Sequence, residues 1–144
     1  MRNLPVEHIA RDYYHLFNDR RFDEAELLVS AQATFHYPHT RATLIGRAGY
    51  RELAQLWMIA FPDAELSIVD MVVRESRVTV QLIGRGTHSG PLAFGGPLVL
   101  EPTGRQGHLP FTDILDIQHG QMLESWVRFD VQDLLERLNR QPQP

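Results

Sequence analysis

The sequence contains no cysteine and no apolar run long enough to cross a membrane. Without cysteine, its 144 residues cannot form disulfides, thiolate nucleophiles or Cys-based zinc and iron–sulfur sites. The formal net charge is −4 and the basic residues are scattered, whereas a nucleic-acid-binding face needs clustered positive charge. No stretch approaches the ~20 apolar residues of a membrane span, and Met1–Tyr14 is too polar for a signal peptide. We therefore expect a soluble, cytoplasmic protein that binds neither nucleic acid nor membrane.

The length and the 43% share of hydrophobic residues are typical of one domain with its own core. A chain of this size buries roughly 70% of the surface that it exposes when unfolded, so it needs no metal or disulfide to fold. No repeat, linker or low-complexity segment interrupts it. We expect a single domain over residues 1–140 and a disordered tail over 141–144.

The hydrophobic period changes from about 3.6 to 2 along the chain. Apolar residues at three- and four-residue spacing predict helices over 6–18, 22–29, 47–60 and 131–139. Alternation predicts strands over 33–37, 64–73, 77–88, 108–117 and 122–129. Pro62 ends the third helix, and Asp130 is placed to cap the last one by accepting from the Asp133 amide.

Helices followed by a meander of strands predict an α+β fold, with a curved antiparallel sheet and helices on its concave side. Gly84 and Gly86 suit a sharp bend late in the strand over 77–88. Residues 89–107 hold five glycines and three prolines, so this segment is expected to leave the sheet and cover something at its end.

The odd-numbered residues of 108–117 are apolar except for Asp113, and those of 122–129 are also largely apolar. A three-residue loop around Gly120 would pair Ile117 with Gln121 and place both odd sets on the inner face. Asp113 would then lie opposite Ser125 in a mostly apolar cavity. Burial should raise the pKa of such a carboxyl, as suits a general acid or base. The competing interpretation is an aspartate satisfied by Ser125, a backbone amide or water, with no chemical role.

Other side chains are expected at the same cavity. His88 continues the inner set of the strand over 77–88 and is the second catalytic candidate, although a lone histidine is more often structural. The expected substrate-binding residues lie on the predicted inner faces: Tyr14, Tyr37, His39, Trp57, Phe61, Phe111, Ser125, Val127 and Phe129. His36, His108 and His119 are expected at the surface, and Arg85 is expected to point outward.

Motifs for metals and cofactors are lacking. The seven histidines show no helical His-Glu-x-x-His pair, so we predict no metal site. No Walker, dinucleotide-binding or Gly-x-Ser-x-Gly motif is present either, and we predict no cofactor.

Several short sequence motifs occur in an order that is typical of one known family. These are Phe17-Asn18, Gly86-Thr-His-Ser-Gly90, Pro102-Thr-Gly-Arg105, Gly120-Gln-Met-Leu-Glu-Ser-Trp126 and Phe129-Asp130. With the element order, they resemble the SnoaL-like polyketide cyclases of the nuclear transport factor 2-like superfamily. The resemblance implies a cone-shaped α+β barrel, a mixed or antiparallel sheet, a deep hydrophobic pocket, no cofactor and commonly a homodimer. It also implies an aspartate on the last long strand that moves a proton beside a carbonyl.

This sequence departs from that family at the catalytic position, which is occupied by Val127. Asp113 is the nearest inward carboxylate, so one hypothesis is a cyclase or isomerase in which Asp113 moves the proton and His88 or Tyr37 polarises a carbonyl. A variant orients a polyketide or polyene by shape alone. The alternatives are a non-catalytic small-ligand-binding or dimerisation module and, third, an epoxide hydrolase. Trp126, on the predicted outer face, favours a homodimer.

Overall fold

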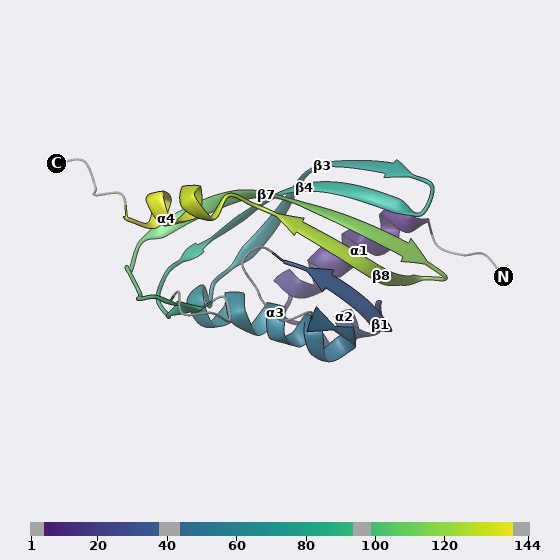
Figure 1. Ribbon diagram of the computed structural model, residues 1–144, viewed down its shortest axis with the longest axis horizontal. Helices are drawn as coiled ribbons and strands as arrows, with labels where there is room; N and C mark the ends of the chain where they lie inside the picture. Colours follow the sequence, from purple (N-terminus) through teal and green to yellow (C-terminus); the bar gives the residue numbers. More distant parts are fainter. Residues whose placement is uncertain (1–4, 38–43, 94–98, 140–144) are drawn as a thin grey trace.

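The computed structural model describes residues 5–37, 44–93 and 99–139 (Figure 1). The helices are α1 (Val6–Asn18), α2 (Phe22–Glu26), α3 (Gly46–Ala60) and α4 (Val131–Asn139). The strands are β1 (Val29–His36), β2 (Leu44–Ile45), β3 (Glu65–Arg74), β4 (Arg77–Thr87), β5 (Leu92–Ala93), β6 (Val99–Leu100), β7 (Gln106–Gln118) and β8 (Gln121–Arg128). None of the described helices is both long and apolar enough to span a membrane.

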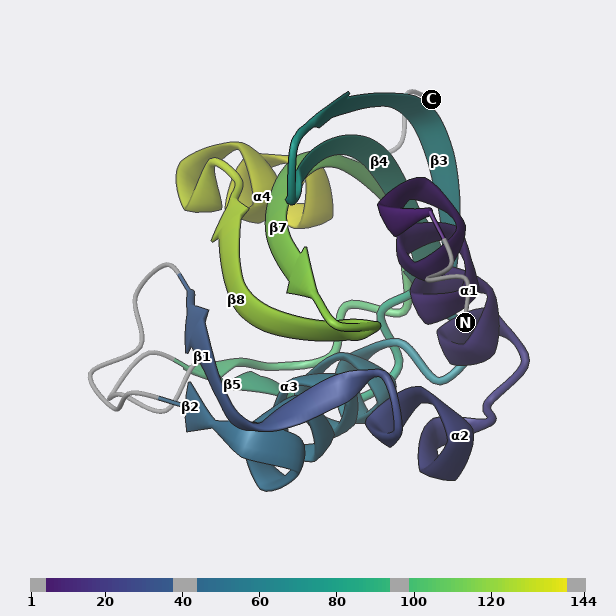
Figure 2. The same cartoon turned by 90° about the vertical axis from the view of Figure 1, so that its right-hand side faces the viewer.

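Six strands form one mixed sheet in the order β2-β1-β8-β7-β4-β3. Only β1 and β8 run parallel, while the other neighbours are antiparallel. Figure 2 shows the long strands curling toward the side on which α1 and α3 lie. The described strands make an open sheet with β2 and β3 at its edges, and not a closed barrel. The predicted α+β fold with a curved sheet is confirmed, as is its mixed character.

The inner face of the sheet and the apolar sides of the helices enclose the core. Alternate β4 residues Val78, Val80 and Leu82 are almost completely buried and pack in one cluster with Ile9 of α1 and Leu53 of α3. Burying these aliphatic side chains stabilises the fold by roughly 1.5–3 kcal/mol each. The alternate inward side chains of the strand therefore form the apolar surface on which the helices pack.

The predicted second helix is too long. It covers residues 22–29 in the sequence pattern, but α2 ends at Glu26 and Val29 begins β1. Val29 is fully buried opposite Met122 of β8, and the Met122 N–H donates to the Leu28 carbonyl over 2.7 Å. Pairing with a distant strand thus overrides the local helical spacing.

The β7–β8 hairpin differs from the expected three-residue loop. Gln118 pairs with Gln121, so the loop is only His119-Gly120, and both residues have positive φ (54° and 77°). This is the backbone that a tight two-residue hairpin requires. Leu123 is then skipped as a bulge between the Ile117–Met122 and Asp116–Glu124 pairs. The predicted opposition of Asp113 and Ser125 is wrong, because Asp113 pairs with Val127.

Ser89 and Gly90, at the start of the glycine- and proline-rich segment, cover the C-terminal end of α3. The backbone N–H groups of Ser89 and Gly90 both donate to the Ala60 carbonyl, at 3.0 and 3.2 Å. A Cβ on Gly90 would lie 1.9 Å from the Ile59 carbonyl oxygen, so this close approach requires glycine. The short pair β5–β6 continues the segment.

At its far end, the chain closes with α4, whose bounds match the predicted helix. The Asp130 carboxylate accepts from the Asp133 N–H over 3.1 Å, as the capping pattern predicted. The predicted tail, 141–144, lies outside the described residues.

On the outer face of the sheet, Trp126 is only half-buried and its ring contacts are made within the chain. It stacks on the His36 ring at 5.5 Å, and the Arg77 guanidinium lies 5.0 Å from its centroid. His36 also lies 2.7 Å from the Glu124 carboxylate. These contacts account for an outward tryptophan without a second copy, and the homodimer stays a prediction.

Candidate functional site

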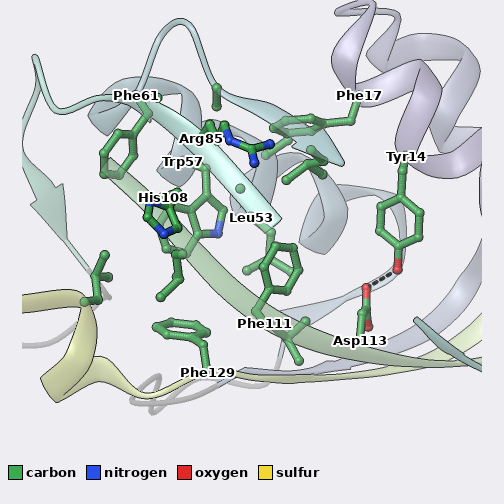
Figure 3. A pocket seen from close by; sticks show the side chains of 18 of the residues that line it. Tyr14, Phe17, Leu53, Trp57, Phe61, Arg85, His108, Phe111, Asp113 and Phe129 are labelled. Atoms are coloured by element: carbon green, nitrogen blue, oxygen red, sulfur yellow. Dashed lines mark hydrogen bonds between the residues drawn. The ribbon is translucent and has the colours of Figure 1, made fainter. Parts of the chain in front are cut away.

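A cavity of about 140 Å³ lies between the inner face of the sheet and helices α1 and α3 (Figure 3). By this measure it has room for about ten water-sized groups, comparable with a one- or two-ring molecule. Its lining is predominantly apolar and aromatic, from Phe17 and Trp57 on the helices to Phe111 on β7. Such a lining favours an apolar ligand oriented by a few polar groups.

Asp113 is the only carboxylate among the described residues that line this cavity. It lies on β7 and is 4% exposed. The Tyr14 hydroxyl donates to Oδ2 and the Ser125 hydroxyl to Oδ1, each over 2.7 Å. Figure 3 shows the Tyr14 hydroxyl reaching from α1 toward the carboxylate. The two donors hold the carboxylate in one orientation beside the cavity.

The surroundings of Asp113 disfavour its charge. The residues paired with it on the neighbouring strands are Val80 and Val127, which offer no polar atom. Burial raises the pKa of Asp113 to about 6, and the hydrogen bonds from Tyr14 and Ser125, which favour the ionised form, offset only part of this effect. A carboxyl with this pKa can both accept and return a proton near neutral pH.

Most of the expected pocket residues lie together. Tyr14, Tyr37, Trp57, Phe61, Phe111, Val127 and Phe129 all line the cavity with Asp113. Tyr37, Trp57 and Phe129 form an aromatic wall, with ring centroids 5.6–6.2 Å apart. Ser125 is 1% exposed and reaches the cavity only through its hydrogen bond to Asp113. His39 lies outside the described residues.

His88 is not among the residues that line the cavity. It is fully buried, stacks on Phe61 at 5.3 Å, and its Nδ1 accepts from the Thr103 N–H over 3.2 Å. Its backbone N–H donates to the Arg105 carbonyl and its carbonyl accepts from the Gly104 N–H, both at 2.8 Å. Burial lowers the pKa of His88, so the neutral ring is favoured. Since β4 ends at Thr87, strand alternation no longer fixes the direction of this side chain.

Replacing His88 by alanine is expected to reduce the free energy of unfolding by about 2 kcal/mol. The substitution leaves the partly buried Thr103 N–H without its acceptor and removes the packing on Phe61. Urea unfolding of His88→Ala beside the exposed-site control His8→Ala would measure the effect. Equal stability of the two variants would contradict a structural role for His88.

Several cavity residues were missed in the sequence. Tyr13 and Tyr50 line the cavity from α1 and α3, and the lining also contains the polar residues Arg85, His108 and Arg137. Tyr50 lies three and four residues before the buried Leu53 and Ala54 of α3, so its helical spacing could have revealed it. Arg85, which was expected to point outward, is exposed and donates to Ser67, but it also lines the cavity.

No group of three His, Asp or Glu side chains within the described ranges is arranged to hold a metal ion. At the cavity, Arg137 instead donates to Asp133 over 2.8 Å and to the His108 carbonyl over 3.2 Å. The lining also supplies the Asp113 carboxyl, which can accept a proton, and four tyrosine hydroxyls, which can donate hydrogen bonds.

Comparison with known proteins places this geometry in a family. The family model described as SnoaL-like polyketide cyclase matches residues 7–138. IdmH from Streptomyces antibioticus, a candidate polyketide cyclase, is 23% identical with a TM-score of 0.79 over 95% of this chain and 100% of its own. An NTF2-like protein of unknown function from Burkholderia pseudomallei K96243 is 13% identical, with a TM-score of 0.74 over 94% and 98%.

TerC, whose structure was determined after co-crystallisation with polyporic acid, is 17% identical with a TM-score of 0.73 over 95% of this chain and 100% of its own. No curated protein matches the chain. At these identities the solved structures establish the fold, and function has to be argued from the site.

Proposed function

The chain belongs to the SnoaL-like polyketide cyclase family, and from its pocket we propose that it catalyses a cofactor-independent cyclisation or isomerisation of an apolar, carbonyl-containing molecule. The observation that carries the proposal is Asp113, a carboxyl with a pKa of about 6 inside an apolar cavity. Family membership supports the reaction class. The co-crystallisation of the similar structure TerC with polyporic acid supports an oxygenated cyclic molecule as the ligand.

In the proposed reaction, Asp113 starts as a carboxylate and removes a proton from a carbon next to a carbonyl. The electron pair of the C–H bond moves into the carbonyl and forms an enolate. The enolate carbon then attacks a second carbonyl carbon in the same molecule, so that one C–C bond forms and that carbonyl oxygen becomes an alkoxide. The alkoxide takes the proton back from Asp113. Atoms and charge balance without any co-reactant.

Tyr14 and Ser125 act as positioning residues in this scheme. Each donates to one carboxylate oxygen, which leaves the remaining lone pairs of those oxygens to accept the substrate proton. Asp113 faces Val127 across the β7–β8 pair. The acid therefore acts from the strand next to the one that carries the usual aspartate of the family, and the valine at 127 serves as wall.

Proton abstraction can be tested with 2-tetralone, a two-ring ketone of suitable size with acidic protons beside its carbonyl. In D₂O the protein is expected to accelerate exchange of these protons for deuterium, measured by mass spectrometry. The rate should rise with pH up to about 6 and level off above it, since the ionised carboxyl is the base. Asp113→Asn should reduce the exchange rate at least about a hundredfold.

Binding of the same ketone, followed by quenching of the protein's tryptophan fluorescence, is the control. Exchange lost in Asp113→Asn while binding persists supports the acid–base reaction. Binding by the wild-type protein without exchange would overturn it and favour the non-catalytic ligand-binding module. A cyclase that acts by shape alone would also fail this exchange test, and turnover of a polyene in Asp113→Asn would identify it.

A further inference from the structure

All four tyrosines of the sequence line the cavity that contains Asp113. Two of them have hydroxyl partners: Tyr14 donates to Asp113, and the Tyr37 hydroxyl is hydrogen-bonded to the Trp57 side chain. Tyr13 and Tyr50 make no hydrogen bond through their hydroxyls within the described part of the chain. Two donors on the helical side of an apolar pocket are thus left for another group.

Tyr13 and Tyr50 lie next to each other although they come from different helices. Their ring centroids are 5.5 Å apart, with an angle of 52° between the planes. Tyr50 is 4% exposed and its hydroxyl is completely buried, whereas Tyr13 is half-buried and packs edge-on against Tyr14 at 5.1 Å. Leaving a buried hydroxyl unpaired is costly, so a native structure normally supplies a partner.

Both hydroxyls stay protonated at neutral pH, so each can donate a hydrogen bond to a ligand. Burial raises the pKa of Tyr13 well above its usual value, and the charges of Tyr50 and Asp113 raise it further. Burial likewise raises the pKa of Tyr50. Tyr13 and Asp113 line the same cavity. Tyr13 also forms one wall of the cavity with Tyr14, which holds the carboxylate.

We infer that Tyr13 and Tyr50 form a second oxygen-binding subsite, which takes a hydroxyl or carbonyl oxygen of the ligand. The Tyr13 hydroxyl donates to this oxygen, and the more deeply buried Tyr50 hydroxyl is the second donor. In the proposed reaction, Asp113 removes a proton from a carbon beside one carbonyl. A further oxygen bound at Tyr13 means that the ligand is a cyclic molecule with at least two oxygen-containing groups. The ligand class rests on the proposed function, but the subsite itself needs only binding.

A pair of probes that differ by one hydroxyl tests the subsite: 2-tetralone and 6-hydroxy-2-tetralone, measured by calorimetry. The wild-type protein should bind the hydroxylated probe roughly fivefold more tightly, as one hydrogen bond to a neutral group provides. Tyr13→Phe should abolish this preference and Tyr50→Phe should reduce it, while the affinity for 2-tetralone stays within about twofold. Melting temperatures check that both variants fold.

Thr112→Val is the matched control, since its hydroxyl lies on the same strand as Asp113 but bonds to Gln81 on the outer face. It should leave the preference unchanged. Equal affinity of the wild-type protein for both probes, down to no detectable binding of either, overturns the subsite, as does a preference that survives Tyr13→Phe. Deuterium exchange of 2-tetralone in Tyr13→Phe separates the outcomes, because it follows Asp113 and can persist when the subsite fails.

Discussion

Inserting one alanine between Leu123 and Glu124 is expected to lower the free energy of unfolding by at least about 4 kcal/mol. Leu123 is the extra residue that lets a two-residue turn be followed by strands whose odd-numbered residues share a face. A second extra residue would shift the rest of β8 by one position, which would bring Glu124 and Trp126 to the inner face and turn Ser125 and Val127 outward. A buried unpaired charge alone costs about 3–5 kcal/mol. Asp113 would also lose the hydrogen bond from Ser125.

The matched control is the deletion of Leu123. It removes the bulge residue itself, so Asp113 still pairs with Val127, now in a regular ladder. This variant should keep most of the wild-type stability, measured by urea unfolding. If the insertion variant is as stable as the wild-type protein, or if the deletion is as destabilising as the insertion, the single extra residue of the bulge does not set the face of β8.

Replacing Asp113 by asparagine is expected to stabilise the protein by up to about 3 kcal/mol at pH 8 and by little at pH 4. The pKa of Asp113 is about 6 in the folded protein, against 3.8 for an ordinary aspartate. Between these values the folded state holds a proton that the unfolded state has released, so wild-type stability falls as pH rises and is level above pH 6. The shift corresponds to about 3 kcal/mol. Tyr14 and Ser125 can rotate their hydroxyls to bond an amide.

Urea unfolding of the two proteins between pH 4 and 8 measures this difference, and comparing them cancels the contributions of other titrating groups. Asp116→Asn is the control on the same strand, where the carboxylate faces outward and lies 3.4 Å from the Gln118 amide. It should change stability by no more than about 0.5 kcal/mol at any pH. A pH-independent effect of Asp113→Asn would contradict the burial of a titrating carboxyl.

The sequence was most informative where one residue breaks a regular pattern. Asp113 interrupts an apolar alternation on β7, and alternation depends only on the local backbone, so its inward direction could be predicted. The same holds for α4, whose Asp130 cap is a local contact. At junctions between elements, local patterns do not determine the conformation. His88 follows the last residue of β4, and Val29 follows a short helix, so in both cases distant partners decide the conformation.

The sequence by itself determined the α+β class, the family resemblance and the presence of one acid in an apolar surface, because these follow from composition, periodicity and the order of local signals. Only the tertiary structure decided which residues surround that acid. Asp113 faces Val127 because of the Leu123 bulge, Tyr14 reaches it from the far end of the chain, and Tyr13 meets Tyr50 across two helices. These contacts join residues far apart in sequence, and their free energies arise only when the sheet curls and packs against the helices.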